Sequence, residues 1–332
     1  ATAGILLLGL VSTLAPVTGK DAMVYRLAIP EGFAAAGGFV NPGPNIFGYL
    51  ALGAEMNGTW ALLASRTLSR QAGESAFAFT LFFSFPLLLA AVFAVCRRWS
   101  GSSRSAAVAS FVLAAVPTLY FVASSSYIDH IVALYILLAV HSLGEWIEER
   151  NKSFAISGGL ALGMACAVKL TAAFAIPGIG IALLIIARSL QEKVPDIAKH
   201  LLHAALLIFG ISALIASPWY IRTWKLSGSP VFPFYAHIWP GHANGWDAER
   251  SQLSQIYLSQ YGGSNKGFVD YLATPLKASI SAQPENPSDY DGVIGVIFLV
   301  AVLIFILNAS RRRLLIQSGV FLTVALVWSF AW

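Results

Sequence analysis

Residues 75 to 123 read SAFAFTLFFSFPLLLAAVFAVC, then RRWSGSSR, then SAAVASFVLAAVPTLYFVA. The first and last pieces are apolar runs of 22 and 19 residues, and the middle piece carries Arg97, Arg98 and Arg104. A helix needs roughly 17 to 25 apolar residues to cross the hydrocarbon core of a bilayer. The stretch therefore predicts two transmembrane helices joined by a short basic connector.

The composition of the whole chain is also that of a membrane protein. Of its 332 residues, 57% are hydrophobic and only 11% are charged, against roughly 25% charged in a soluble domain. These values exclude a disordered chain, and the scattered basic residues exclude a nucleic-acid-binding protein. Two cysteines, Cys96 and Cys166, are too few for a disulfide framework. Ala1 and Trp332 lie inside apolar runs, so we expect the sequence to be truncated at both ends.

Similar apolar runs recur along residues 1–332 and predict a single transmembrane domain with about nine crossings. The fold class that we expect is therefore an all-α polytopic membrane protein. Several runs are close to the lower length limit, and the first and last are incomplete. The predicted crossings are residues 1–15, 75–96, 105–123, 131–147, 154–170, 172–187, 201–217, 293–309 and 314–332.

The basic residues predict the orientation of these crossings. Every second connector is rich in arginine and lysine, and four such connectors hold 11 of the 21 basic residues. Cytoplasmic connectors carry the excess of positive charge, so these four are expected in the cytoplasm. The 11 residues are Arg97, Arg98, Arg104, Arg150, Lys152, Arg188, Lys193, Lys199, Arg311, Arg312 and Arg313.

Two segments on the opposite side, residues 16–74 and 218–292, are too long to be simple connections. In the first outer segment, Asn45 to Ala64 is apolar but interrupted by glycines and by Glu55. This pattern predicts an interfacial helix with Glu55 facing water. The second outer segment is rich in aromatic residues, glycine and proline, and it is expected to form an ordered lid or platform.

Ionisable residues at the outer ends of the predicted helices are the candidates for chemistry. Asp21 follows the first crossing, Asp129 and His130 lie between the third and fourth, Lys169 ends the fifth, and Arg222 follows the seventh. Such side chains at membrane depth are costly and mark functional sites. Two cations and a carboxylate on one face suit a reaction of a phosphorylated lipid, because the cations hold phosphate oxygens and the carboxylate accepts a proton.

Four motifs give the chain a resemblance to a known superfamily. They are TGKDAMVYRL at 18–27, YIDHIVALY at 127–135, GLALGMACAVKLTA at 159–172 and SPWYIRTWKLSGSPVFPF at 217–234. Together, over roughly residues 5–240, they resemble the GT-C superfamily of integral-membrane glycosyltransferases. These enzymes use sugars carried on polyprenyl phosphate. The last motif is the most specific of the four.

The resemblance implies an inverting glycosyltransferase in a bacterial inner membrane, with its active face periplasmic or extracellular. It assigns Asp21 as the catalytic base and Lys169 and Arg222 as cations at the donor phosphate. Asp129 and His130 would form a second acidic site that can hold a divalent cation. The implied partners are a polyprenyl-phosphate-linked sugar, membrane lipids and other membrane subunits. Residues expected at the acceptor or in the lid are Tyr25, Arg26, Trp219, Tyr220 and Trp224.

One departure from the superfamily pattern concerns Arg26. Related bacterial sequences often read DAxxYHL in the first motif, whereas this chain has Arg26 in place of the histidine. If that histidine binds acceptor or metal, this chain has altered specificity or has lost activity. The alternative function is therefore a non-catalytic structural or accessory subunit of a larger membrane complex that kept a GT-C-like fold.

Other interpretations of the same residues remain open. Asp129 could cap a helix, Lys169 could extend to the lipid headgroups, and Arg222 could belong to an aromatic belt. A transporter would carry inverted repeats and charges at the midplane, which the sequence does not display. A haem or chlorin carrier would use His130, His141 or His203 as ligands.

Overall fold

The computed structural model describes residues 1–190, 197–259, 267–281, 292–297, 299–300 and 324–325. Over these residues the chain is helical, apart from connections and one isolated bridge between Ala243 and Trp246. The prediction of an α-helical fold is confirmed for this part of the protein. The helices are α1 (Thr2–Ser12), η1 (Ala22–Arg26), α2 (Ala28–Ala36), η2 (Ile46–Tyr49), α3 (Gly53–Ser65), α4 (Arg70–Phe82), α5 (Ser84–Ser100), α6 (Ser103–Ala114), α7 (Pro117–Ser124), α8 (Asp129–Glu149), α9 (Lys152–Val168), η3 (Leu170–Phe174), α10 (Ala175–Leu190), α11 (Ile197–Ser227), α12 (Ala248–Ser259) and α13 (Phe268–Ile280).

Three helical stretches are long and apolar enough to cross a membrane. They are Arg70–Ser100, which joins α4 to α5, then α8, and Ala198–Ser227 of α11. Helices α6 and α7 are bent by 69° relative to each other, and they add a fourth crossing if the two together form one broken span. Helices α1 and α9 and the stretch Leu170–Ile185 are apolar but shorter. Three or four of the predicted crossings are thus supported, and those at 293–309 and 314–332 lie almost wholly outside the described residues.

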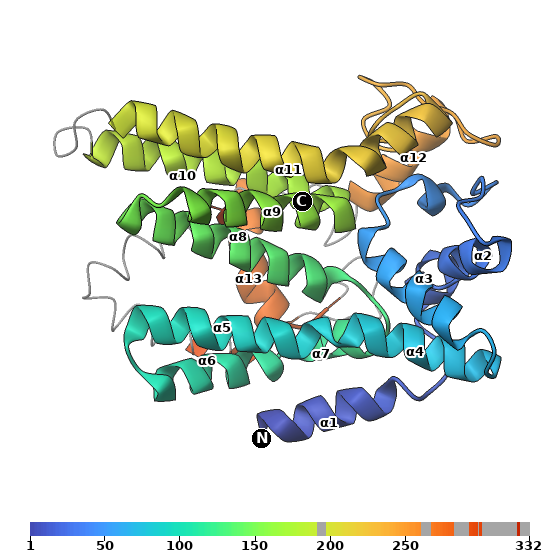
Figure 1. The fold of residues 1–332 in the computed structure, drawn as a ribbon, viewed down its shortest axis with the longest axis horizontal. Helices are drawn as coiled ribbons and strands as arrows, with labels where there is room; N and C mark the ends of the chain where they lie inside the picture. The colour runs from blue at the N-terminus through green and yellow to red at the C-terminus, as the bar shows by residue number, and fades with distance from the viewer. Residues whose placement is uncertain (191–196, 260–266, 282–291, 298, 301–323, 326–332) are drawn as a thin grey trace.

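Helix α9 packs between α8 and α11 and forms the centre of the bundle (Figure 1). Its glycines let α11 approach closely, as small residues do where helices pack in membranes. A methyl group added at Gly159 would lie 2.9 Å from the Ile208 carbonyl oxygen. One added at Gly163 would lie 2.8 Å from Ile215 Cβ. These two positions therefore set the spacing between α9 and α11.

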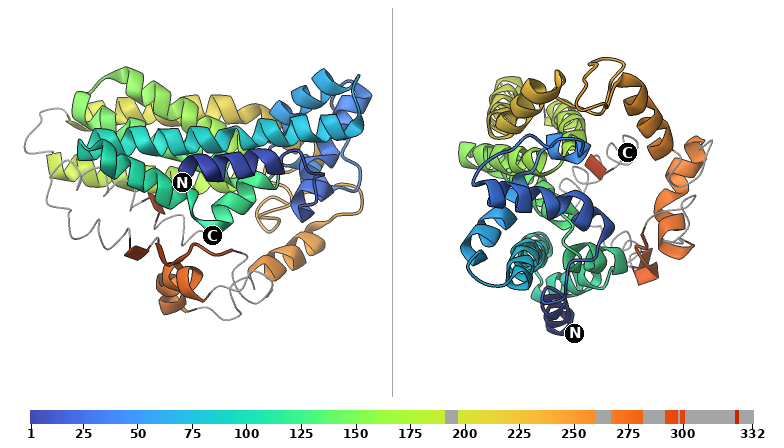
Figure 2. Two further views of the ribbon diagram at one scale, coloured as in Figure 1. Left: turned by 90° about the horizontal axis from the view of Figure 1, so that it is seen from below. Right: turned by 90° about the vertical axis from the view of Figure 1, so that its right-hand side faces the viewer.

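The connections between the helices gather at two ends of the bundle. The α5–α6 and α8–α9 connections lie at one end in Figure 1, whereas α2, α3 and α12 lie at the other, which we call the outer end. At the first end, Arg98 Nη2 lies 2.8 Å from Glu145 Oε2 and ties α5 to α8. Helix α13 lies at the periphery of the bundle (Figure 2).

Helix α11 is longer than the sequence predicts. The apolar run predicts a crossing over residues 201–217, and a proline follows at position 218. Proline lacks a backbone N–H and usually interrupts a helix. The helix instead continues through Pro218 to Ser227. The Leu214 carbonyl, which would accept from an N–H at position 218, accepts from the Ser217 hydroxyl at 2.9 Å. Residues 218–227 are therefore helical and not part of a loop.

The two outer segments pack against each other. Asn244 Nδ2 donates to the Tyr49 hydroxyl at 2.7 Å, and the Tyr49 and Phe232 rings meet edge to face at 5.4 Å. Thr223 on α11 donates to the Tyr49 carbonyl. The second outer segment is thus anchored on the first up to α12, while residues 260–266 and 282–291 lie outside the described part.

We predict that Gly163→Leu destabilises the protein by about 1 to 3 kcal/mol, because its side chain would overlap α11. Thermal unfolding of the detergent-solubilised protein measures the change as a lower melting temperature. Gly210→Leu is the matched control, because no atom lies within 4 Å of the added Cβ. Equal melting temperatures for both variants would contradict the packing described.

We predict that α12 lies outside the cytoplasm and that the α5–α6 connector lies inside, because the basic connectors are retained in the cytoplasm. In a chain lacking Cys96 and Cys166, Gln252→Cys and Ser103→Cys place single thiols at these exposed positions. A membrane-impermeant maleimide should label Gln252→Cys in intact cells, and Ser103→Cys only after permeabilisation. The reverse pattern would invert the topology.

Candidate functional site

Asp129 and Lys169 meet at the outer end of the hairpin formed by α8 and α9. Helix α8 begins at Asp129 and α9 ends at Val168, and the two run antiparallel. Lys169 Nζ lies 2.6 Å from Asp129 Oδ1, and both side chains are partly exposed. No side chain caps α8. The Asp129 carboxylate thus pairs with Lys169, as expected if both belong to one site.

A second ion pair joins η1 to α3 within the first outer segment. Arg26, at the end of η1, donates through Nη1 to Glu55 Oε1, and both side chains are almost completely buried. Burial favours the neutral guanidine, but the attraction of Glu55 outweighs it, and the pKa of Arg26 lies above its ordinary value. The expectation that Glu55 faces water is wrong, because its exposed fraction is 0%. Arg26 requires a buried carboxylate, and Glu55 supplies it.

Tyr25 connects this ion pair to Asp21. Arg26 Nη2 donates to the Tyr25 hydroxyl at 3.1 Å, and that hydroxyl donates to Asp21 Oδ2 at 2.7 Å. The Tyr25 ring stacks on Phe47 with 4.4 Å between centroids. Burial raises the pKa of Tyr25 well above its usual value, so its hydroxyl stays protonated. A hydrogen-bond chain therefore runs from Glu55 through Arg26 and Tyr25 to Asp21.

The two ion pairs influence each other electrostatically. The Asp129 carboxylate contributes to the raised pKa of Arg26. We therefore treat Asp21, Tyr25, Arg26, Glu55, Asp129 and Lys169 as one group, the outer polar cluster. It contains three carboxylates and two cations, so it has one negative charge in excess.

The carboxylates of the outer polar cluster differ in their partners. Glu55 pairs with Arg26, and Asp129 pairs with Lys169. Within the described residues, the hydrogen bond that Asp21 receives comes from the neutral hydroxyl of Tyr25. Asp21 is also partly exposed. It is thus the carboxylate best placed to exchange a proton with a bound molecule.

His130, which the resemblance places with Asp129 in a second acidic site, packs against α4. Its ring is fully buried, and Nε2 lies 3.0 Å from the Leu81 carbonyl oxygen on α4. In the part of the chain described here, no group of three or more His, Cys, Asp or Glu side chains is positioned to hold a metal ion. The geometry around His130 therefore favours a packing role, and it does not support a metal site with Asp129.

Arg222 lies in a different pocket from Lys169. Its Nη1 donates to the Gly48 carbonyl at 2.9 Å, and its guanidinium lies 5.7 Å from the Phe39 ring centroid. With Phe39 and Lys225 it lines a cavity of about 430 Å³ on α11. The structure thus brings Asp129 and Lys169 into contact but gives Arg222 its own surroundings. Its role at a donor phosphate stays a prediction.

The aromatic residues expected at the acceptor or lid have three different environments. Tyr220 donates to the Cys166 carbonyl at 3.0 Å, which ties α11 to α9. Trp219 packs on an apolar cluster that includes Tyr25. Trp224 is 60% exposed. Of the three, Trp224 is the one that a ligand or lipid could reach without displacing the core.

Comparison with known proteins places the chain in a family without an assigned activity. No curated protein and no solved structure matches it. One family model matches residues 56–332, which include Asp129 and Lys169 but begin just after Glu55. The match covers more than half of the chain, and the protein therefore belongs to the family described as Domain of unknown function (DUF8201).

Proposed function

We propose that the protein is an inverting glycosyltransferase of the GT-C type in a bacterial inner membrane. It would transfer a sugar from a polyprenyl-phosphate donor to an acceptor at the periplasmic or extracellular face. The observation that carries the proposal is the contrast between the carboxylates: Asp21 is held by a neutral hydroxyl, whereas Asp129 is neutralised by Lys169. A general base needs an available carboxylate next to a bound acceptor.

In this mechanism the Asp21 carboxylate accepts a proton from an acceptor hydroxyl or amine. The acceptor atom attacks the anomeric carbon of the donor as the bond from that carbon to the phosphate oxygen breaks. The electron pair of that bond leaves with the phosphate, and the new bond forms on the opposite face of the sugar. Tyr25 holds the base in place through its 2.7 Å hydrogen bond.

Lys169 is the cation proposed for the departing phosphate. An ammonium group has three N–H donors, and leaving-group phosphate needs neutralisation of charge more than protonation. Lys169 Nζ is partly exposed and is fixed by Asp129 at 2.6 Å, so its position does not depend on the ligand. Such pre-organisation favours the transition state, because little has to move when the charge develops.

A non-catalytic subunit is the competing function, and one observation favours it. The residue that departs from the superfamily motif, Arg26, is buried and paired with Glu55 within the chain. Such a pair can serve the fold without serving any reaction. In that case the outer polar cluster would fix the first outer segment, and partner subunits would bind elsewhere on the protein.

We predict that Asp21→Asn lowers the transfer rate roughly 100- to 10,000-fold, because the amide keeps the shape of the side chain but cannot accept the proton. The measurement is the recovery of membrane glycans or glycolipids in a deletion strain complemented with each variant. Asp270→Asn is the control, because it alters an exposed carboxylate that pairs with Lys277 on α13. Full complementation by Asp21→Asn would reject the enzymatic role and favour the accessory subunit.

We predict that Arg26→Met destabilises the protein by about 3 to 5 kcal/mol, because it leaves the Glu55 charge buried without its partner. The double variant Arg26→Met, Glu55→Met should recover most of this loss, since apolar residues of similar volume replace both charges. Thermal unfolding in detergent compares the variants. Equal melting temperatures for the single and the double variant would show that the two charges do not depend on each other as the geometry requires.

A further inference from the structure

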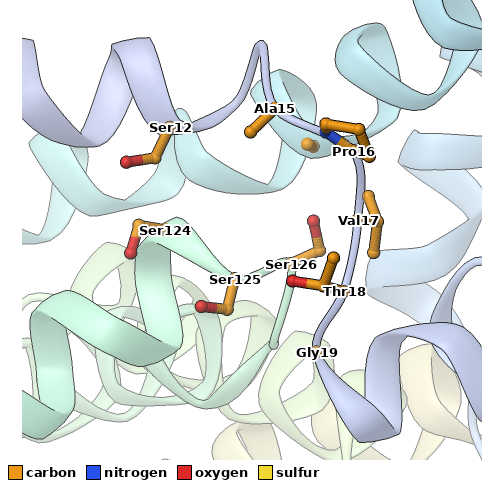
Figure 3. A pocket seen from close by; sticks show the side chains of 10 residues that line it. Ser12, Ala15, Pro16, Val17, Thr18, Gly19, Ser124, Ser125 and Ser126 are labelled. Atoms are coloured by element: carbon orange, nitrogen blue, oxygen red, sulfur yellow. The ribbon is translucent and has the colours of Figure 1, made fainter.

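A small polar pocket lies beside the outer polar cluster. It has a volume of about 190 Å³ and lies between the loop 15–19 and the turn 124–126 (Figure 3). Its wall carries five hydroxyl side chains, those of Ser12, Thr18, Ser124, Ser125 and Ser126. The loop leads into Asp21, and the turn leads into Asp129. Asp21 comes two residues after Gly19 and Asp129 comes three residues after Ser126, so the chain connects both walls of the pocket to the cluster.

Three of these hydroxyls have no hydrogen-bond partner within the described residues. Ser12 and Ser124 donate to carbonyl groups of their own helices, at 3.0 Å and 2.8 Å. Thr18, Ser125 and Ser126 form no side-chain hydrogen bond there. Thr18 is exposed and Ser125 is partly exposed, and a hydroxyl that faces an open pocket can both donate to and accept from a polar ligand. Hydroxyls without a partner in the described residues thus stand on both sides of one pocket and are available to a polar ligand.

The backbone around the pocket is held in an unusual conformation. Ser126 has φ of 62°, in the left-handed region that favours glycine, and its side chain is almost completely buried. Such conformations in residues other than glycine gather at functional sites. Across the pocket, a Cβ on Gly19 would lie 3.0 Å from the Ser125 carbonyl oxygen. Gly19 thus allows the two walls to approach.

We propose that this pocket binds the ring of a sugar through its hydroxyl groups, an inference that deepens and rests on the proposed function. Hydroxyl side chains both donate and accept, so they match a ligand that does the same at neighbouring positions. The pocket is smaller than the roughly 300 to 1,000 Å³ of sites for drug-sized ligands. One ring with several hydroxyls suits both its size and its lining.

The bound sugar can be that of the donor or that of the acceptor. A phosphate group on the sugar distinguishes the two. A donor sugar carries a phosphate that Lys169 would contact, whereas an acceptor sugar does not. Mannose 1-phosphate should therefore bind more tightly than methyl α-D-mannopyranoside if the pocket holds the donor ring, and Lys169→Met should abolish the difference. Equal binding of the two probes assigns the pocket to the acceptor.

The test is direct binding to the full chain in lauryldimethylamine oxide, a detergent without a sugar headgroup. Saturation-transfer NMR titrations use methyl α-D-glucopyranoside, methyl α-D-galactopyranoside and methyl α-D-mannopyranoside, with cyclohexylmethanol as a ring of similar size with one hydroxyl. The double variant Thr18→Val, Ser126→Gly removes two hydroxyls, and glycine suits the left-handed backbone at position 126. Thr80→Val, Ser281→Ala removes two hydroxyls outside the pocket and is the matched control.

We expect saturable binding of at least one methyl glycoside and none of cyclohexylmethanol. Affinity should fall about tenfold in the double variant, from the loss of two neutral hydrogen bonds, and stay unchanged in the control. No saturable binding to the wild-type chain, or equal binding by the double variant, would overturn the proposal. Binding needs no transfer, so a wild-type protein that binds sugar without any complementing activity would refute the proposed function alone.

Discussion

The buried ion pair between Arg26 and Glu55 is the constraint on which the outer end of the protein depends. Removing two charges from water costs several kcal/mol for each ion, and their attraction compensates only when the geometry is good. Arg26 follows directly on Tyr25, and Glu55 is part of α3. Holding these charges together therefore fixes η1 against α3, and Tyr25 with it.

That constraint gives the carboxylates of the outer polar cluster different tasks. Glu55 neutralises a buried cation, and Asp129 fixes the ammonium group of Lys169. Asp21 receives a hydrogen bond from Tyr25, whose own position is set by the buried pair. A single chain thus combines structural carboxylates with one that remains open to a ligand. The different partners of the three carboxylates are more informative about function than the number of charges at the site.

The sequence predicted the helical class, because long apolar runs leave few alternatives in a membrane. It placed Asp129 and Lys169 at helix ends on one side without pairing them, and the structure shows the ion pair. The sequence could not predict that Glu55 is buried, since a lone carboxylate in an apolar stretch normally faces water. Arg26 is an equally unusual cation in the same outer segment and was the sequence signal for a partner of Glu55. The two residues are 29 positions apart, so their pairing depends on the fold. The sequence also did not predict that α11 continues through Pro218. The Ser217 hydroxyl donates to the Leu214 carbonyl, which the proline leaves without its usual N–H donor.

The length of α11 fixes the height at which the outer segments stand. Its 31 residues extend about 46 Å at 1.5 Å per residue, against roughly 30 Å for the hydrocarbon core of a bilayer. The helix is thus about 16 Å longer than the hydrocarbon core is thick. Thr223, near the end of α11, attaches the first outer segment to the helix. The end of α11 therefore fixes where the first outer segment lies along the axis of this helix.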